Sequence, residues 1–228
     1  MSNNTSKNPR SRTVITPSGG IVRGKFPSKK NGRMIHHEGL LELEACYLFE
    51  MSPLVMAYNE QPQKISYAAH NRIAKYFPDF TLQLDSGETV FVEIKHSAIL
   101  ARAEVQEKYN QITDHMLRED QPFSILTETS IRQEPRLSNL RLAYRELLPH
   151  ALTNARLESV LPHLAILKEP TIGDVSSILQ PHKISAFDLL ARGYLSCDLT
   201  LPLNSSTPVS ISKERDYDSV RLSEELSL

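Results

Sequence analysis

The 228-residue sequence contains no tryptophan, only two cysteines and only eight glycines. Cys46 and Cys197 lie far apart and lack the short spacing of metal-binding cysteine pairs, which favours buried thiols in a reducing compartment. No apolar run approaches the length of a membrane span, and no apolar signal-peptide core lies near Met1. These absences predict a cytoplasmic protein with no membrane partner.

Charge is nearly balanced overall but unevenly distributed along the chain. The formal net charge is −1, yet the segment up to Gly39 has eight Lys and Arg residues and Glu38 as its only acid. Such a basic segment predicts either a solvated tail or a contact with a phosphate backbone. The candidate DNA contacts in it are Arg23, Lys25, Lys29, Lys30 and Arg33.

The composition predicts a packed core and more than one structural unit. Hydrophobic residues make up 40% and charged residues 23% of the sequence, which argues against wholesale disorder. We divide the chain into a basic arm over 1–34, a main α/β domain over 35–148, a connector with a smaller domain over 149–211, and a tail over 212–228. The tail lacks a core and carries many charges, so we predict that it is disordered until bound.

Two short apolar strands flank the turn Asp85-Ser86-Gly87. A three-residue loop with a left-handed glycine pairs Phe80 with Val92 and Leu82 with Val90. This register separates an apolar face from a charged face, whereas a one-residue slip would mix them. It sets Asp79 opposite Glu93, roughly 5 Å apart, with Lys95 on the same solvent-facing side.

Two carboxylates this close repel each other unless a cation lies between them. Oxygen ligands suit Mg²⁺, which binds one or two protein carboxylates together with substrate phosphate. Lys95 could orient or deprotonate a water molecule, or stabilise negative charge on a phosphate. The pattern therefore predicts metal-assisted phosphodiester hydrolysis. The alternative is a surface hairpin whose outer face happens to be charged.

The surrounding pattern predicts a mixed sheet flanked by helices. Helices are expected over 36–51, 97–118 and 137–148, and strands over 55–58 and 122–127. In the first helix, Glu42 and Glu44 both lie among apolar residues, so periodicity does not decide which one faces the Asp79–Glu93 pair. We expect Ser97 to cap the second helix.

The C-terminal part predicts two short helices over 171–179 and 184–193, followed by a hairpin from 194–199 and 208–211. This order resembles a winged helix. Lys183 and Arg192 are the only basic residues between Thr171 and Leu203, which favours protein docking over DNA binding.

Five segments together resemble the TnsA endonuclease family, within the Pro-Asp…Asp/Glu-x-Lys nuclease superfamily. The resemblance covers roughly residues 15–130 and rests on 33–42, Pro53-Leu54-Val55, Glu60-Gln61-Pro62, Phe77-Pro78-Asp79-Phe80 and Val92-Glu93-Ile94-Lys95. It implies an α/β fold with a restriction-endonuclease-like mixed sheet and a small C-terminal winged-helix-like domain. The basic Gly-Lys-Phe-Pro-Ser-Lys run resembles members from CRISPR-associated transposons.

The resemblance also implies a site and partners. The catalytic set would be Glu42, Asp79, Glu93 and Lys95, with Mg²⁺, replaceable by Mn²⁺, on Glu42, Asp79, Glu93 and Ile94. The choice of Glu42 over Glu44 rests on this resemblance. The implied activity is cleavage of the 5′ ends of a transposon in double-stranded DNA, together with the TnsB transposase and the TnsC ATPase. Two alternatives remain: a non-cleaving adaptor between DNA-bound proteins, and a stand-alone restriction or repair nuclease.

Overall fold

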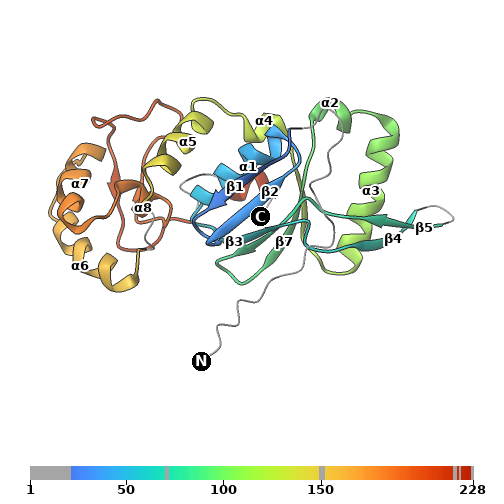
Figure 1. The fold of residues 1–228 in the computed structure, drawn as a ribbon, viewed down its shortest axis with the longest axis horizontal. Helices are drawn as coiled ribbons and strands as arrows, with labels where there is room; N and C mark the ends of the chain where they lie inside the picture. The colour runs from blue at the N-terminus through green and yellow to red at the C-terminus, as the bar shows by residue number, and fades with distance from the viewer. Residues whose placement is uncertain (1–21, 70–71, 149–151, 218–219, 221, 227–228) are drawn as a thin grey trace.

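Four strands form the mixed sheet at the centre of the fold (Figure 1). In a computed structural model of the chain, they are β3 (Val55–Glu60), β6 (Phe80–Leu84), β7 (Thr89–Ile94) and β8 (Phe123–Leu126), in the order β3-β6-β7-β8. β3, β6 and β7 are antiparallel neighbours, and β8 runs parallel to β7. The structure describes residues 22–69, 72–148, 152–217, 220 and 222–226.

The register of the β6–β7 hairpin is as predicted. Phe80 pairs with Val92 and Leu82 with Val90. The loop is closed by a hydrogen bond of 2.8 Å from the Leu84 amide to the Glu88 carbonyl, and Gly87 has a φ of 87°. A left-handed glycine with no Cβ penalty therefore fixes the pairing of both strands.

Helices cover both faces of the sheet. On one face, α1 (Leu40–Met51) and α5 (Arg136–Glu146) join a large apolar core with inward residues of β3, β6 and β7. On the other face, α3 (Ala103–Arg118) buries Tyr109, Ile112 and Met116 in a second cluster with Phe91 of β7. The short helices α2 (Ser97–Leu100) and α4 (Glu128–Ile131) lie before α3 and after β8.

Two predicted helices differ from expectation: one begins later in the sequence and the other is split in two. The helix expected from residue 36 begins at Leu40, because β2 (Arg33–His37) pairs with β1 (Gly24–Ser28) in a hairpin. Phe26 and Ile35 of that hairpin are buried in the large core, so part of the expected arm belongs to the fold. The helix expected over 97–118 is interrupted between α2 and α3, and the Ser97 hydroxyl bonds Glu128 instead of capping a helix.

A separate hairpin lies between β3 and Asp79. It consists of β4 (Ile65–Ala69) and β5 (Arg72–Tyr76), which pair with each other in antiparallel fashion. We had not predicted β5, because its sequence combines charged and small residues with little apolar alternation.

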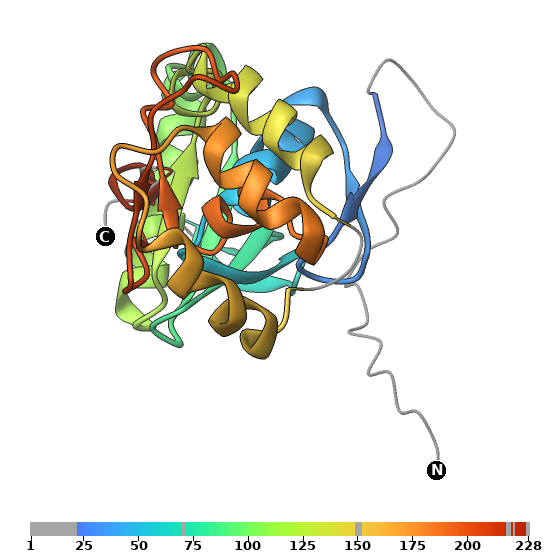
Figure 2. The ribbon, with the colours of Figure 1, turned by 90° about the vertical axis from the view of Figure 1, so that its left-hand side faces the viewer.

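The C-terminal part contains the two expected helices, α7 (Ile172–Leu179) and α8 (Ala186–Leu190), and the expected hairpin, with the two-residue strands β9 (Leu195–Ser196) and β10 (Ser210–Ile211). It also contains the helix α6 (Asn154–Leu164) and the 3₁₀ turn η1 (Gln180–His182). Figure 2 looks onto these helices, in orange, in front of the sheet. Two helices and a short hairpin agree with the predicted order, but they do not by themselves establish a winged-helix domain.

The tail is structured where the structure describes it, in contrast to the predicted disorder. Val220, Leu222 and Leu226 are buried in the large core, and α9 (Leu222–Leu226) lies against β8. Three apolar side chains among many charges suffice for docking because the core provides the complementary surface. None of the helices in the described part of the chain combines the length and the apolar character of a membrane span.

Candidate active site

Asp79 lies at the start of β6, where the backbone fixes it from two sides. Its Oδ2 accepts a hydrogen bond of 2.8 Å from the amide of Ile94 on the neighbouring strand β7. Its carbonyl accepts a hydrogen bond of 2.8 Å from the amide of Gln61, at the end of β3. Burial, together with the charges of Glu93 and Glu42, raises the pKa of Asp79 well above its usual range.

Glu93 on β7 is buried and held by three side chains. Its Oε2 accepts a hydrogen bond of 2.7 Å from the Tyr76 hydroxyl, and its Oε1 accepts one from the Tyr109 hydroxyl. The Lys95 ammonium is 2.9 Å from Oε1. We had expected this face of the hairpin to contact solvent, but α3 and the β4–β5 hairpin cover it and leave Glu93 only 4% exposed.

The two tyrosines were missed as site residues. Tyr76 ends β5 and Tyr109 lies in the apolar stripe of α3, so each had the pattern of a core residue. A buried tyrosine needs a partner for its hydroxyl, and here the two share one carboxylate. Burial, and after it the charge of Glu93, raise the pKa of both hydroxyls. The periodicity of the sequence shows that such a residue is buried, but not which atom its hydroxyl meets.

Glu42 extends the acidic cluster from the other side of the sheet. It lies in the first turn of α1, and its Oε2 accepts a hydrogen bond of 2.8 Å from the Glu38 amide. Burial raises the pKa of Glu42 to about 7, and the charges of Glu38 and Glu93 act in the same direction. For Lys95, burial alone would lower the pKa, but Glu93, Asp79 and Glu42 together raise it and keep the side chain an ammonium.

Glu44 does not join this cluster. Its two oxygens pair with Arg132 at 2.6 Å and with Arg141 at 2.7 Å. These arginines come from the end of α4 and from α5, so Glu44 faces the helical layer. The charge of Glu42, and not that of Glu44, thus acts on the pKa of Asp79.

The arrangement can be compared with what a divalent cation requires. The donor chemistry fits, because the charge of Glu93 raises the pKa of both Asp79 and Glu42, and a cation between these carboxylates would relieve that repulsion. In the described residues, however, no three His, Cys, Asp or Glu side chains come close enough together to hold a metal ion. The backbone amide of Ile94 is bonded to Asp79, and the Ile94 side chain is buried in the core.

Four of the five basic side chains between residues 22 and 34 contact other parts of the protein. Arg23 is 3.7 Å from Glu38, and Arg33 forms a bidentate pair with Glu60. The ammonium groups of Lys29 and Lys30 donate to backbone carbonyls, whereas Lys25 is exposed. A phosphate contact by Lys30 would require a carbonyl partner of its ammonium to be released, and a DNA contact by any of the five remains a prediction.

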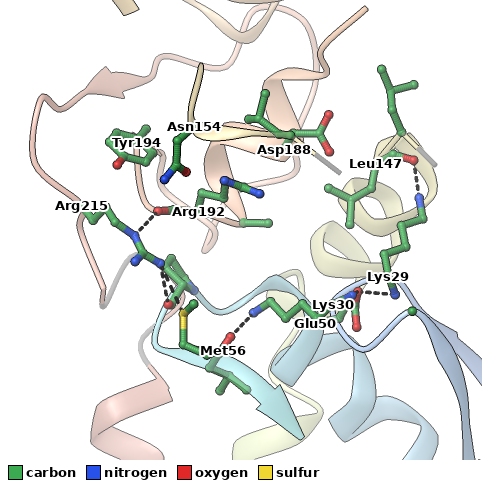
Figure 3. A pocket seen from close by; sticks show the side chains of 16 residues that line it. Lys29, Lys30, Glu50, Met56, Leu147, Asn154, Asp188, Arg192, Tyr194 and Arg215 are labelled. Carbon is green, nitrogen blue, oxygen red and sulfur yellow. Dashed lines mark hydrogen bonds between the residues drawn. The ribbon is translucent and has the colours of Figure 1, made fainter. Parts of the chain in front are cut away.

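A cavity of about 790 Å³ lies away from the acidic cluster, between the end of α1 and the C-terminal part. Figure 3 shows Lys29 and Lys30 approaching it from one side and Arg192 and Arg215 from the other. Arg215 donates to the carbonyl of Arg192 and pairs with Asp85 at 2.6 Å. The cavity is therefore lined by basic groups, but the candidate catalytic residues are not part of its lining.

A mixed sheet flanked by helices, with acids and a lysine where two strands meet, is consistent with a nuclease fold. Residues 52–128 match a family model described as the TnsA-like endonuclease N terminal domain. The matched segment includes Asp79, Glu93 and Lys95, while Glu42 precedes it. No curated protein matches the chain. The match supports the resemblance to TnsA-like endonucleases, whereas an origin in a CRISPR-associated transposon remains a prediction.

Proposed function

We propose that this protein is the DNA endonuclease subunit of a heteromeric transposase. The observation that supports this most directly is the meeting of Asp79, Glu93 and Lys95 at the β6–β7 junction, inside the segment that matches the TnsA-like family model. The match itself suggests a transposase nuclease, and the three side chains have the chemistry that phosphodiester cleavage needs.

Each residue has a distinct role in the proposed reaction. Asp79 is fixed before substrate binds, because the Ile94 amide holds it, and such preorganisation lowers the cost of reaching the transition state. Glu93, which Tyr76 and Lys95 hold, is the second carboxylate. The Lys95 ammonium stabilises negative charge as it develops on the phosphate. Glu42 adds a third carboxylate from α1.

We further propose Mg²⁺ as the cofactor, with Mn²⁺ able to replace it. Asp79, Glu93, Glu42 and the backbone of Ile94 are the residues that would hold it. When bound, such an ion supplies Lewis acidity at the phosphate and a nucleophilic water at neutral pH. No three potential ligands are grouped among the described residues, so a shell of three carboxylates would need Glu42 or Glu93 to turn toward the ion.

The finer assignment concerns partners. We propose cleavage of the 5′ transposon ends while TnsB processes the 3′ ends and TnsC links both to target selection, as in the TnsA family, and we propose a CRISPR-associated transposon as the element. The C-terminal helices with the β9–β10 hairpin would then be a winged-helix-like docking module for protein.

The test is strand-specific nicking at transposon ends with TnsB, TnsC and Mg²⁺ present. Asp79→Ala should reduce nicking by at least about a hundredfold, because it removes a carboxylate that would hold the Mg²⁺ ion at the reacting phosphate. Glu88→Ala is the matched control, since Glu88 is an exposed acid of the same hairpin. If Asp79→Ala nicks as well as the parent, the assignment is wrong. Robust cleavage by the purified chain alone would instead indicate a stand-alone nuclease.

A non-cleaving adaptor is the second candidate, and one observation favours it. Both oxygens of Glu93 already have partners, and no group of three potential ligands occurs among the described residues. Calorimetric titration with Mn²⁺ separates the two candidates. A nuclease should bind the ion, and Glu93→Gln should weaken that binding, whereas an adaptor should show no binding that this variant changes.

A further inference from the structure

The β4–β5 hairpin stands apart from the central sheet. It forms its own two-stranded sheet and pairs with no other strand among the described residues. In Figure 1 it projects beyond α3 at the right of the molecule. An isolated two-stranded hairpin has marginal stability, so other parts of the protein must stabilise this one.

One face of the hairpin is anchored. Its inward residues share the second apolar cluster with α3, and this cluster includes Ile65, Tyr67, Ala69, Tyr76, Tyr109, Ile112 and Met116. Residues from β4 and α3 thus bury each other, which makes the hairpin a firm extension of the body rather than a loose loop. His70 and Asn71, between its strands, are outside the described residues.

The charge of this hairpin has one sign. From Gln61 to Pro78 the sequence contains no Asp or Glu, although the whole chain has 27. Lys64, Arg72 and Lys75 are exposed. Within the described part of the chain, none of the three forms an ion pair or a side-chain hydrogen bond. These positive charges have no acidic partner among the described residues and are complementary to a polyanion such as DNA.

The outward face is narrow and apolar in its middle. Ser66 pairs with Lys75, and Ala68 pairs with Ile73, so these four side chains share the face turned away from α3. Ile73 is 73% exposed. A two-stranded ribbon with small side chains has dimensions that enter a DNA groove, and an isoleucine can pack there against base or sugar surfaces.

The base of the hairpin reaches the candidate active site directly. Tyr76, the last residue of β5, donates to Glu93, and Asp79 follows three residues later. Lys75 is four residues before Asp79, and an extended chain spans at most about 3.6 Å per residue, so their Cα atoms lie within about 14 Å. That is about four nucleotides along one strand of a duplex.

We propose that the β4–β5 hairpin is a DNA-binding arm that contacts the duplex beside the cleaved phosphate. Arg72, Lys75 and Lys64 neutralise backbone phosphates, and Ile73 packs in the groove. This proposal takes DNA as substrate from the proposed nuclease function, but it does not require the carboxylates to be active. It assigns non-specific backbone contact, because the arm carries few groups that could read bases.

The experiment measures binding of the full chain to a fluorescein-labelled duplex of arbitrary sequence and about 30 base pairs, from about 50 to about 300 mM KCl, in EDTA. Fluorescence anisotropy gives the affinity and its salt dependence. Arg72→Ala combined with Lys75→Ala should lower the slope of log affinity against log salt by about 1.8 and weaken binding about tenfold or more. Both residues are exposed, so circular dichroism should show an unchanged fold.

Lys168→Ala combined with Lys213→Ala is the matched control, because both lysines are exposed and the net charge changes equally. The control should retain the parental slope. Three outcomes would each overturn the proposed DNA-binding role of the hairpin. They are equal slopes for the parent and the Arg72/Lys75 variant, an equal loss of slope in the control, and no binding by the parent at about 50 mM salt.

Failure of the arm and failure of the nuclease assignment give different results. Asp79→Ala should bind the duplex in EDTA at least as tightly as the parent, because it removes a carboxylate near the phosphate, while losing nicking. If Asp79→Ala still nicks, the catalytic assignment fails and the binding result stands. If the arm variant binds normally, the arm fails and the catalytic assignment is unaffected.

Discussion

At the scale of single residues, the charges of this protein are paired across long stretches of sequence. Arg33 in β2 binds the two oxygens of Glu60, at the end of β3, at 3.0 and 2.7 Å. Glu60 is 3% exposed. Arg33 is also a candidate DNA contact in the sequence analysis. In the structure it pairs with the buried Glu60, and the effect of this pair on folding stability can be tested apart from DNA binding.

Arg33→Met should destabilise the protein by about 2 kcal/mol at neutral pH, because it leaves a buried carboxylate without its cation. Burial alone would raise the pKa of Glu60, but the hydrogen bonds and charge of Arg33 outweigh it and lower that pKa in the parent. The pair therefore contributes stability above the unfolded-state value of about 4.3, and that contribution is lost as pH falls through the folded-state pKa.

In Arg33→Met the Glu60 pKa should instead be raised, so the variant regains stability as the pH falls. The gap between parent and variant in urea denaturation should shrink from about pH 7 to about pH 4. Arg72→Met, which removes an exposed arginine, should show no such gap. A gap that is independent of pH would contradict the ion-pair explanation.

The tyrosines that hold Glu93 allow a second prediction at this scale. Tyr76→Phe and Tyr109→Phe should each reduce nicking about tenfold, because a hydrogen bond to a charged group contributes about 1.5 kcal/mol and its loss misplaces the carboxylate. Duplex affinity in EDTA should not change, since neither hydroxyl faces the proposed arm surface.

The absence of tryptophan gives these variants a spectroscopic measurement, because tyrosines alone dominate the near-ultraviolet spectrum. Adding Mn²⁺ to the parent should perturb tyrosine absorption as Glu93 changes partners, and each variant should lose part of that difference spectrum. Tyr194→Phe is the control, because its hydroxyl has no hydrogen bond to other described residues. A difference spectrum that survives in Tyr76→Phe combined with Tyr109→Phe would refute the positioning role.

At the scale of elements, α1 connects the candidate site with a half-buried lysine, Lys30, at its opposite end. Glu42 lies in its first turn, and the carbonyls at and after its last turn meet the Lys30 ammonium. The distances are 2.9 Å to Phe49 and 2.7 Å to Val55. Carbonyls at a helix C-terminus lack intrahelical partners, and a cation there also interacts favourably with the negative end of the helix dipole.

Lys30→Met should therefore destabilise the protein by about 2 to 3 kcal/mol, since several carbonyls lose their donor in a part-buried position. Thermal denaturation measures the loss, and Lys25→Met is the matched control because Lys25 is exposed in the same hairpin. If Lys30→Met is as stable as the control but binds DNA more weakly, Lys30 is a phosphate contact rather than a helix cap.

At the scale of the whole molecule, the sheet and the C-terminal part share one core. The large apolar cluster includes Leu82 of β6, Leu140 of α5 and Leu189 of α8. A single polar side chain strengthens this connection. Asn139 on α5 donates to the carbonyls of Leu199 and Leu201 at 2.9 and 2.8 Å, and accepts from the Leu203 amide at 3.0 Å.

Asn139→Ala should cost about 3 kcal/mol, because three backbone groups lose their partner in a buried place. Since the core is continuous, calorimetry should show one unfolding transition that moves to lower temperature as a whole. Ser138→Ala, at the exposed neighbouring position, should leave the transition unchanged. Two separate transitions, with only one of them shifted, would show that the two parts unfold independently.

Local rules allowed the sequence to determine the β6–β7 hairpin in detail. The turn Asp85-Ser86-Gly87 and the two-residue alternation of apolar side chains act within about fifteen residues, and together they fix the register that brings Asp79 next to β7. The same short-range patterns predicted the main helices and the strands β3, β6, β7 and β8 in their order along the chain.

Only the tertiary structure decided which groups surround those residues. Glu42 and Glu44 look alike in the helical pattern, and Arg132 and Arg141, about ninety residues later, separate them. The tyrosine donors of Glu93, the carbonyl partners of Lys30 and the anchoring of the β4–β5 hairpin on α3 likewise depend on contacts between distant segments. Periodicity states how deeply a side chain is buried, whereas the direction of its polar atoms depends on where the rest of the chain places its partners.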